Sequence, residues 1–386
     1  MKLSIIIPVY NVCMFLRETL DSVIRQTYED IEIICVDDGS TDGSSDILTE
    51  YATKDNRIHI ISQPNSGTYK ARQKGIGFAN GDYIIFLDGD DWLDPKTCEQ
   101  VAACIEDTHA DIIQYGAIIE SSSPKSSLAH NCEAWINVNE EDIHGSDNIL
   151  EKCFISHTIP GNIATKAIKT EIAKKAQVYQ PSMKISTLED SIAFFYILLF
   201  SEHWHRIDAK LYHYRLGGGT STKTNISLTD VLKSLNPYKA LIDMRDYTEK
   251  NATSETAKII VNKYLLESAV NDSYYYYSRL SNNVSFEEVK SIWSDDIDHK
   301  DLAYILIGIK YRSVLNDIST LQHSCEIQQQ HINYLEAENK RLQYSTSVFS
   351  HDNKRLQLFF EYKLIKWVFI IVRKYRDFFR KTKSHL

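Results

Sequence analysis

Short apolar runs alternate with amphipathic stretches over the first hundred residues of the chain. The apolar runs are rich in isoleucine and valine, and each of the first three is followed by a segment with helical spacing, which is typical of strand–helix–strand units. The expected strands lie at 3–7, 31–36, 58–61 and 83–87, and the expected helices at 12–25, 44–53 and 67–79. This pattern predicts an α/β fold with a mostly parallel sheet and helices on both faces.

The pattern is less regular farther along the chain. Residues 111–119 form another strand-like run, whereas residues 120–148 are polar and serine-rich and predict a loop-heavy segment. From Leu228 to Ile309 the spacing is helical, and no cluster of side chains there is typical of catalysis. We therefore predict a catalytic domain at 1–222, with halves at 1–110 and 111–222, followed by a helical domain at 223–310.

A heptad pattern follows at residues 311–345, with a lone Asn339 at one core position. Such a pattern is typical of a coiled coil that forms a dimer. The alternative is a long helix packed on its own domain. A homodimer through this segment is the oligomeric state that the heptad favours.

The tail at residues 351–386 differs from the rest of the chain in charge. The chain has a formal charge of −9, yet eight Lys or Arg residues and a single acid lie between Lys363 and Lys383. Apolar residues recur on one helical face of this segment, which predicts an amphipathic helix in the headgroup region of an anionic membrane. The alternative is that this face packs on another helix of the chain or of a coiled-coil partner.

Composition narrows the class of protein. No apolar run approaches the ~18 residues of a membrane span, and the N-terminus lacks the features of a signal peptide. The seven cysteines are scattered and form no C-x-x-C pair, which indicates neither a disulfide framework nor a zinc site. We expect a cytoplasmic protein, peripheral on the inner face of the cell membrane. The acidic body has no basic stripe, so nucleic acid is not an expected partner.

Four aspartates fall within nine residues at FLDGDDWLD, directly behind the apolar run at 83–87. Carboxylates this close repel one another and raise each other's pKa unless a cation lies among them. Gly89 lets the backbone turn so that Asp88 and Asp90 face one hard cation with oxygen ligands. We therefore predict a Mg²⁺ or Mn²⁺ site at Asp88 and Asp90; the alternative is a capped loop without metal.

The remaining two aspartates of the cluster have a structural interpretation. Asp91 and Asp94 lead through Pro95 into a helix expected at 96–105. Aspartate is favoured at helix starts, and proline is tolerated in a first helical turn. We expect Asp91 and Asp94 to be capping or solvated positions.

Six motifs in order resemble those of family 2 glycosyltransferases, the inverting enzymes with the A-type nucleotide-sugar-binding fold: SIIIPVYN, VDDGSTD, NSGTYKARQKGI, GDYIIFLDGDDWLDP, LEDSIAFF and LYHYR…TST. The motifs cover residues 1–222. The resemblance implies a Rossmann-like sheet, a nucleotide-binding half at 1–110 and an acceptor half at 111–222. It also implies transfer of a sugar from a nucleotide diphosphate donor to an acceptor hydroxyl with Mg²⁺ or Mn²⁺.

The resemblance places several donor-binding residues in the first half. Tyr10 matches the position whose ring lies against the nucleobase, and Pro8 stiffens the turn before it. Asp38 would accept a hydrogen bond from the base edge, which favours uracil and a UDP-sugar, whereas Asp37 is expected to be a turn residue. Asn65 and Arg72 match positions near base and phosphate, and a guanidinium suits diphosphate oxygens; the alternative for Arg72 is a surface ion pair.

The second half contributes the expected general base. Residues 186–189 match a capping box in which Glu189 reaches back to the helix start, and the resemblance also places Glu189 at the substrate site. By resemblance, Asp190 is the catalytic base that removes the acceptor proton. Arg215 and Ser221 belong to the closing motif over donor or acceptor, next to a glycine run that suits a lid.

Three histidines near the closing motif raise the question of a second metal site. His203, His205 and His213 are interleaved with Trp204 and Tyr212. The interpretation that we favour is packed or exposed histidines, and a metal site is the alternative.

These observations predict an inverting, metal-dependent glycosyltransferase of the hexosyl- or N-acetylhexosaminyl-transferring kind. Its acceptor would be a glycan or a lipid-linked oligosaccharide in bacterial surface-polysaccharide synthesis. One alternative is a catalytically inactive nucleotide-sugar-binding scaffold that organises a polysaccharide assembly complex. A sugar-nucleotide-synthesising enzyme is a further alternative, but it would need a glycine-rich loop after the first strand, where the chain has Pro8 to Asn11.

Overall fold

The computed structural model describes residues 1–121, 127–137, 142–181, 185, 188–216, 236–251, 253–266 and 268–269. The predicted coiled coil at 311–345, the predicted tail at 351–386 and Ser221 lie outside the described residues. The same is true of most of the predicted helical domain at 223–310. Where that region is described, it is helical as predicted, in α10 (Asn236–Lys250), α11 (Glu255–Ile259) and η2 (Ile260–Leu265). No described helix has both the length and the apolar character that a membrane crossing requires.

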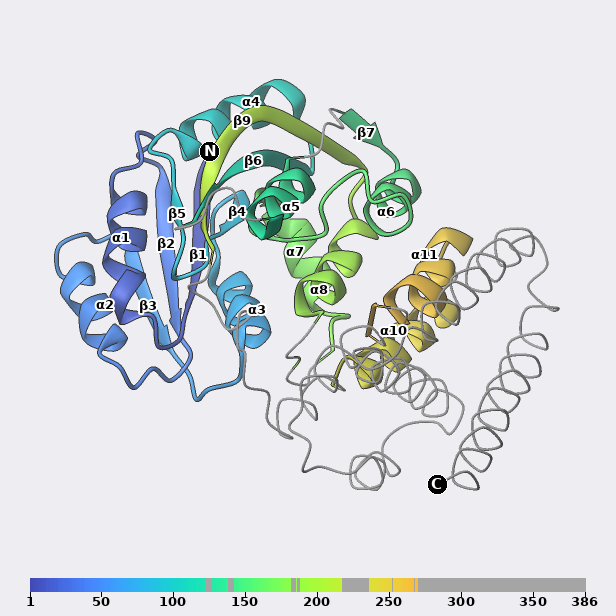
Figure 1. The fold of residues 1–386 in the computed structure, drawn as a ribbon, viewed down its shortest axis with the longest axis horizontal. Helices are drawn as coiled ribbons and strands as arrows, with labels where there is room; N and C mark the ends of the chain where they lie inside the picture. Colours follow the sequence, from blue (N-terminus) through green and yellow to red (C-terminus); the bar gives the residue numbers. More distant parts are fainter. Residues whose placement is uncertain are drawn as a thin grey trace, which may run out of the picture. The chain divides into compact units, whose positions relative to one another are not determined.

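The described residues contain one nine-stranded sheet with the order β3-β2-β1-β4-β8-β6-β9-β5, and β7 pairs with β9 (Figure 1). Four strands at one side of the sheet are mutually parallel, which confirms the predicted strand–helix–strand units: β1 (Leu3–Val9), β2 (Ile31–Asp37), β3 (Ile58–Ser62) and β4 (Tyr83–Phe86). In this part of the sheet Val9 lies opposite Asp37 and Ile6 lies opposite Phe86. The carboxyl ends of the strands therefore meet at one edge.

The other side of the sheet has mixed directions. β8 (Lys166–Lys169) is antiparallel to both β4 and β6 (Ile112–Glu120). β9 (His203–Arg215) runs parallel to β6, and β5 (Trp92–Leu93) is antiparallel to β9. Because β9 pairs with both β5 and β6, it carries the closing motif back to the segment that follows Asp88.

Helices cover both faces of the parallel strands, as the sequence predicts (Figure 1). Alternate residues of β1, such as Ile5 and Ile7, join one buried core with α1 (Cys13–Ile24), α2 (Ser44–Ala52) and α4 (Thr97–Thr108). On the opposite face α3 (Thr68–Phe78) packs on Ile6. A Cβ at Gly75 would lie only 2.4 Å from Ile6 Cγ2, so glycine permits the close approach of α3 to β1. α7 (Thr170–Gln177) and α8 (Glu189–Leu198) pack next to α3.

The loop-heavy interpretation of residues 120–148 is wrong for the described part of that segment. It contains α5 (Ser127–Ile136) and β7 (Asp142–His144), and α6 (Ser146–Phe154) begins within it. Ile136 and Ile143 are each only 4% exposed. Isolated apolar residues between polar ones thus anchor these elements to the core, and burial outweighs the polar composition.

Candidate active site

The candidate site lies where β1, β2 and β4 end, the edge at which parallel α/β sheets bind ligands. Tyr10 and Asp38 directly follow β1 and β2, and Asp88 lies two residues beyond the end of β4. Tyr10 is 47% exposed, and its ring is accessible from solvent. Pro8 is the penultimate residue of β1 and is buried. The sheet thus brings three predicted donor-binding segments to one edge.

Arg72 joins the predicted metal site to the predicted base. Its Nη2 donates to Asp88 Oδ1 at 2.7 Å, and its Nη1 donates to Asp190 Oδ1. The surface alternative for Arg72 is wrong, because the residue is only 8% exposed. Residues 72, 88 and 190, from α3, the end of β4 and the start of α8, therefore form one ion-paired cluster.

The Arg72 guanidinium is held in its charged form. Burial disfavours the charge, but the carboxylates of Asp190 and Asp88 outweigh it and raise the pKa of Arg72. Among the described residues, its buried Nε has no hydrogen-bond partner. A buried donor without a partner is costly, and an incoming anion would offer it an acceptor. Arg72 is thus suited to the diphosphate contact that the motif resemblance implies.

Asp90 lies beside Asp88 in a partly buried position. Burial raises the pKa of Asp90 above its usual range, and the neighbouring charge of Asp88 adds a smaller increase. Repulsion between two neighbouring carboxylates has this effect. The oxygen donors of Asp88 and Asp90 fit a hard divalent ion such as Mg²⁺ or Mn²⁺, which would relieve the repulsion.

The prediction that Asp91 is a capping or solvated residue is wrong. Asp91 is 2% exposed, and α4 begins six residues later at Thr97 with Lys96 as its N-cap. Its carboxylate accepts from the Tyr212 hydroxyl and from the Arg215 backbone N–H, each at 2.7 Å. Burial, with the nearby charge of Asp88, raises the pKa of Asp91 to about 8. The carboxylate fastens the closing motif to the loop that carries Asp88 and Asp90, because β9 passes directly beside it.

Asp94 is not the N-cap of α4 either, but it is partly exposed and shapes the turn before the helix. Its Oδ1 accepts from the backbone N–H of Lys96 at 2.9 Å, and its carbonyl accepts from the Thr97 N–H at 3.0 Å. The side chain therefore shapes the turn that leads into α4. Asp37 is likewise a turn residue, since its Oδ1 accepts from the Ser40 N–H at 2.9 Å.

The predicted capping box at Glu189 is not formed. α8 begins at Glu189 itself, with Leu188 as N-cap in the left-handed region at φ 56° and no side-chain cap. Glu189 is thus the first residue of the helix and not the third, which is the position that a capping box requires. Burial raises the pKa of Glu189, and the charge of Asp190 adds a smaller increase. Both Glu189 and Asp190 line the small space beside Arg72, so Glu189 is available at the site rather than committed to a cap.

Asp38 organises the loop that leads into α3. Its Oδ1 accepts from Gln63 Nε2 at 2.8 Å and from the Ser66 N–H at 2.7 Å, and its Oδ2 accepts from the Gly67 N–H at 2.7 Å. The residue is 2% exposed. Its side chain thus positions this loop, which contains Asn65.

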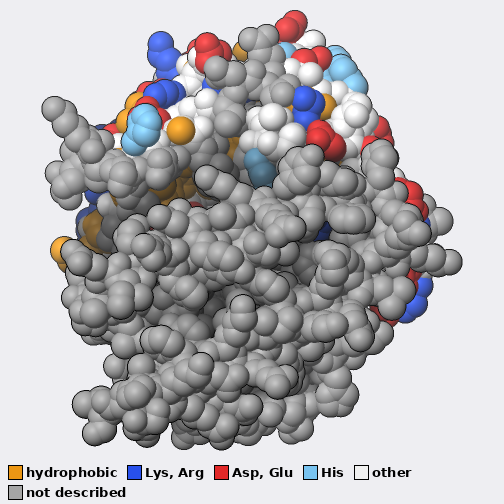
Figure 2. Space-filling model, turned by 45° about the vertical axis from the view of Figure 1, so that its right-hand side comes forward, with side chains coloured by type: hydrophobic (Ala, Val, Ile, Leu, Met, Phe, Trp, Pro, Cys, Tyr) orange, Lys and Arg blue, Asp and Glu red, His pale blue; other side chains and the backbone are white. Residues whose placement is uncertain are grey.

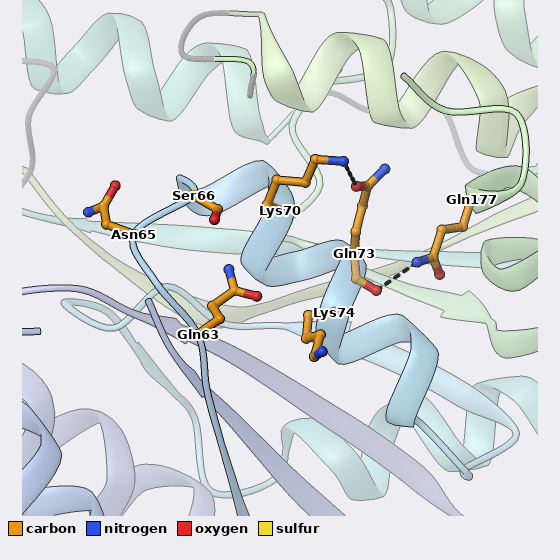
Figure 3. A pocket seen from close by; sticks show the side chains of 7 residues that line it. All are labelled: Gln63, Asn65, Ser66, Lys70, Gln73, Lys74 and Gln177. Atoms are coloured by element: carbon orange, nitrogen blue, oxygen red, sulfur yellow. Dashed lines mark hydrogen bonds between the residues drawn. The ribbon is translucent and has the colours of Figure 1, made fainter. Parts of the chain in front are cut away.

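A cleft of about 460 Å³ opens beside this loop (Figure 3). Its lining is polar and comes from the loop, from α3 and from α7: Gln63, Asn65, Ser66, Lys70, Gln73, Lys74 and Gln177. Lys70 Nζ donates to Gln73 Oε1 at 2.8 Å across one rim. Asp88, Asp90 and Asp190 do not line it. The cleft therefore neighbours the loop that Asp38 positions and is separate from the carboxylate cluster.

Arg215 is held by contacts within the chain. Its Nη2 donates to Glu18 at 2.5 Å, and its Nε donates to the Asp90 carbonyl at 2.9 Å. Its guanidinium also lies 4.6 Å from the centre of the Trp92 ring. Arg215 thus supports the backbone of the loop that carries Asp88 and Asp90.

Sequence reasoning missed two supporting residues. The Tyr212 hydroxyl lies 3.3 Å from the Asp88 N–H, in addition to its bond to Asp91. The Thr19 hydroxyl in α1 donates to the carbonyls of Gly89 and Asp91 at 3.0 and 2.7 Å. The LYHYR motif contains Tyr212 and drew attention to its neighbourhood, whereas no pattern in the sequence marks Thr19.

The first part of the chain is similar to a known protein family. Residues 4–166 match the family model of glycosyl transferase family 2. These residues therefore form a family 2 glycosyltransferase domain, as the motifs predicted. Asp190 and Arg215 lie beyond the matched residues.

Several curated relatives share part of the chain. Glycosyltransferase GlyA of Streptococcus pneumoniae serotype 4 is 45% identical over 111 residues, which are 29% of this chain and 16% of GlyA. A putative teichuronic acid biosynthesis glycosyltransferase of Bacillus subtilis, TuaG, is 37% identical over 134 residues, 34% of this chain and 53% of TuaG. The chain thus matches only about half of TuaG and far less of GlyA.

The fold has a counterpart among solved structures. The crystal structure of S. aureus TarS superimposes with a TM-score of 0.52 at 18% identity, over 80% of this chain and 53% of TarS. This similarity supports the α/β glycosyltransferase fold.

Proposed function

We propose that this protein is an inverting glycosyltransferase that transfers a sugar from a nucleotide diphosphate donor, of the UDP type, to an acceptor hydroxyl. The observation that carries the proposal is the cluster in which Arg72 pairs with both Asp88 and Asp190. It lies at the sheet edge of a family 2 domain. The transferred group is a hexosyl or N-acetylhexosaminyl unit.

In the proposed reaction, Asp190 accepts the proton of the acceptor hydroxyl while the oxygen attacks the anomeric carbon. The bond from that carbon to the diphosphate oxygen breaks on the opposite face, so the nucleoside diphosphate leaves and the configuration inverts. A Mg²⁺ or Mn²⁺ ion held by Asp88 and Asp90 would supply charge neutralisation for the leaving diphosphate.

Arg72 links donor binding to the base in this proposal. The guanidinium contacts Asp88 and Asp190. A diphosphate would compete for the guanidinium, because charged phosphate oxygens are strong acceptors for arginine. Arg72 would then turn part of its hydrogen bonding to the donor and leave Asp190 available to the acceptor hydroxyl.

We propose a bacterial surface polysaccharide as the product, with a glycan or lipid-linked oligosaccharide as acceptor. The support is that a relative at 37% identity, TuaG, carries the description of teichuronic acid biosynthesis. The proposed organisation keeps the catalytic domain at 1–222, the helical domain at 223–310, the dimeric coiled coil at 311–345 and the membrane-binding tail at 351–386.

The central test is turnover of a panel of nucleotide sugars by purified full-length protein. Asp190→Asn should reduce transfer by about 10²-fold or more, with donor affinity close to that of the parent. Asp147→Asn is the matched control, since Asp147 is an exposed acid in the first turn of α6, as Asp190 is in the first turn of α8. Normal transfer by Asp190→Asn would place the base elsewhere. Donor binding by the parent without any turnover would favour the inactive scaffold.

The metal role has its own measurement. Calorimetry of UDP binding should show a requirement for Mg²⁺ or Mn²⁺ and loss of binding with chelator. Asp90→Asn should weaken this binding, because it removes one charged ligand while it preserves the shape. Equal UDP affinity with and without a divalent ion would exclude the proposed metal at Asp88 and Asp90.

The membrane proposal for the tail is tested by flotation with liposomes. Full-length protein should float with anionic vesicles and dissociate as salt rises. Protein truncated after Ser350 should not float with the vesicles. Equal binding by the truncated form would exclude the tail as the membrane anchor.

A further inference from the structure

Two short strands bring four potential metal ligands together away from the residues discussed above. β7 pairs with the start of β9 in antiparallel register, with Asp142 opposite His205, Ile143 opposite Trp204 and His144 opposite His203. His213, the third histidine singled out in the sequence, lies elsewhere on β9, where its Nδ1 is 3.0 Å from Glu120. The fold thus separates His213 from the other two and adds Asp142 and His144.

The pairing directs the four ligands to a single face. Side chains alternate along a strand, so Ile143 and Trp204 share the inner face, where they are 4% and 0% exposed. Asp142, His144, His203 and His205 share the outer face, and their side chains are 21% to 68% exposed. Histidine side chains are visible on the described part of the surface in Figure 2. An ion in solution therefore has direct access to the imidazoles.

Asp142 is the centre of this outer-face cluster. Its Oδ1 lies 2.7 Å from His203 Nε2 and 3.1 Å from His205 Nδ1, and its Oδ2 lies 3.0 Å from His144 Nε2. The rings of His144 and His203 stack with centroids 4.2 Å apart. One ligand atom from each of Asp142, His144 and His203 lies within 4.8 Å of the others. Although partial burial raises its pKa, the hydrogen bonds from His203 and His205 dominate and lower the pKa of Asp142 to about 2.

We propose that Asp142, His144 and His203 bind a divalent transition-metal ion of the zinc class. His205 would orient the Asp142 carboxylate through its hydrogen bond to Oδ1. Two imidazoles and one carboxylate are ligands that Zn²⁺ takes in tetrahedral sites, where water can be the fourth ligand. At metal–ligand distances of about 2.0–2.2 Å, ligand atoms of a tetrahedron lie about 3.4 Å apart. Asp142 lies 2.7 Å from His203 and 3.0 Å from His144 through its two oxygens, and the ligand atoms of all three residues lie within 4.8 Å of one another. Small side-chain rotations would therefore bring these atoms to coordination distances. The metal would take the place of the shared protons.

The proposed ion would join β7 to β9 through side chains in addition to the backbone pairing. It differs in chemistry from the Asp88 and Asp90 site, which offers only oxygen ligands and suits Mg²⁺ or Mn²⁺. The inference does not depend on glycosyl transfer, because none of the four residues belongs to the proposed reaction. The competing interpretation is a hydrogen-bonded cluster that binds no metal.

The experiment uses full-length protein without a histidine tag, freed of metal with chelator and then titrated with Co²⁺ as a spectroscopic probe. A tetrahedral site with imidazole ligands should give intense visible absorption in a one-to-one complex, and added Zn²⁺ should abolish it. Excess Mg²⁺ should leave the absorption unchanged. Asp90→Asn should also retain it, which separates this site from the oxygen-ligand site.

The variants decide between the two interpretations. His203→Gln and His144→Gln should each weaken Zn²⁺ binding by about tenfold or more, since even changes around the ligands of such sites have effects of this order. His213→Gln is the matched control on the same strand and should bind Zn²⁺ as the parent does. Circular dichroism in chelator should show that all variants are folded. The proposal is overturned if the parent gives no one-to-one Zn²⁺ complex, or if His203→Gln and His144→Gln bind as tightly as the parent.

Discussion

Replacing Arg72 with methionine tests the central ion-paired cluster. Methionine keeps most of the length and apolar volume of the side chain but removes the charge. The Asp88 and Asp190 carboxylates, which share the guanidinium in the parent, would then face each other without a cation. The perturbation thus isolates the electrostatic part of the contribution of Arg72.

The magnitude follows from burial. Removing one partner of a fully buried ion pair costs about 3–5 kcal/mol, whereas exposed pairs contribute at most about 1 kcal/mol. Arg72 is 9% exposed at its side chain, but Asp88 and Asp190 keep 29% and 33% of theirs. Water can therefore hydrate the carboxylates in part, and we expect Arg72→Met to lower the free energy of unfolding by about 2–3 kcal/mol.

Urea unfolding at pH 7 in the presence of chelator measures this loss. With a slope of about 2 kcal/mol per molar urea, the midpoint should fall by about 1 M. Asp190→Asn in the Arg72→Met background should restore part of the stability, with a coupling energy on the order of 1–2 kcal/mol. Arg72→Lys should lie between the parent and Arg72→Met, because it keeps the charge and loses the two-pronged geometry.

Mg²⁺ provides an internal check on the same samples. Because a cation replaces the missing positive charge, Mg²⁺ should stabilise Arg72→Met more than the parent. A loss of less than about 0.5 kcal/mol, or strict additivity of the two substitutions, would refute the view that Arg72 is the countercharge for both carboxylates.

Further predictions concern packing and buried ionisable groups, and urea unfolding checks each. Gly75→Ala should lower the free energy of unfolding by about 1–3 kcal/mol, because its Cβ would lie 2.4 Å from Ile6 Cγ2. A Cβ at Gly77 in the same helix meets nothing within 4 Å, so Gly77→Ala should raise the free energy of unfolding by up to about 1 kcal/mol. Equal effects of the two substitutions would contradict the packing argument. Burial lowers the pKa of Lys166 to about 7. Above that pH the unfolded chain binds more protons than the folded one, so the destabilising effect of the buried lysine decreases as pH rises. The stability of the parent relative to Lys166→Met should therefore increase by up to about 1.4 kcal/mol per pH unit between pH 7 and 10, and a constant difference would refute this. Asp91 gives the opposite sign: burial raises its pKa to about 8, so the stability of the parent relative to Asp91→Asn, measured in chelator, should fall as pH rises from about 4 to 8, and a rising difference would show that the carboxylate is paired in its charged form.

The local pattern of the sequence determined the first half of the fold. Buried parallel strands are continuous apolar runs, so β1, β2 and β4 are recognisable without tertiary information, as are the helices between them. The same order of elements fixes which residues follow the strand ends, so the sequence alone places Asp38 and Asp88 at the same edge of a parallel sheet. The assignment of Asp190 came from resemblance, because no local rule marks it as a base.

Contacts between distant segments required the tertiary structure. That Arg72 bridges residues 88 and 190 depends on how α3 and α8 pack, and residues 72 and 190 are 118 positions apart. Asp91 is buried instead of solvated because β9 returns to cover it through Tyr212. A local sequence pattern specifies helix or strand, but it carries no information on which surface a later segment will cover.

The two groups of metal-ligand candidates differ in the same way: one is set by the local sequence and the other by tertiary structure. Asp88 and Asp90 are two positions apart, so backbone geometry alone places both carboxylates near one point. Asp142 and His203 are 61 positions apart and meet only through the pairing of β7 with β9. The sequence by itself determined the elements and the chemistry near each strand end, because both depend on neighbours along the chain. Only the tertiary structure decided which of those chemical groups share a site, because strand register and helix packing set the distances between remote residues.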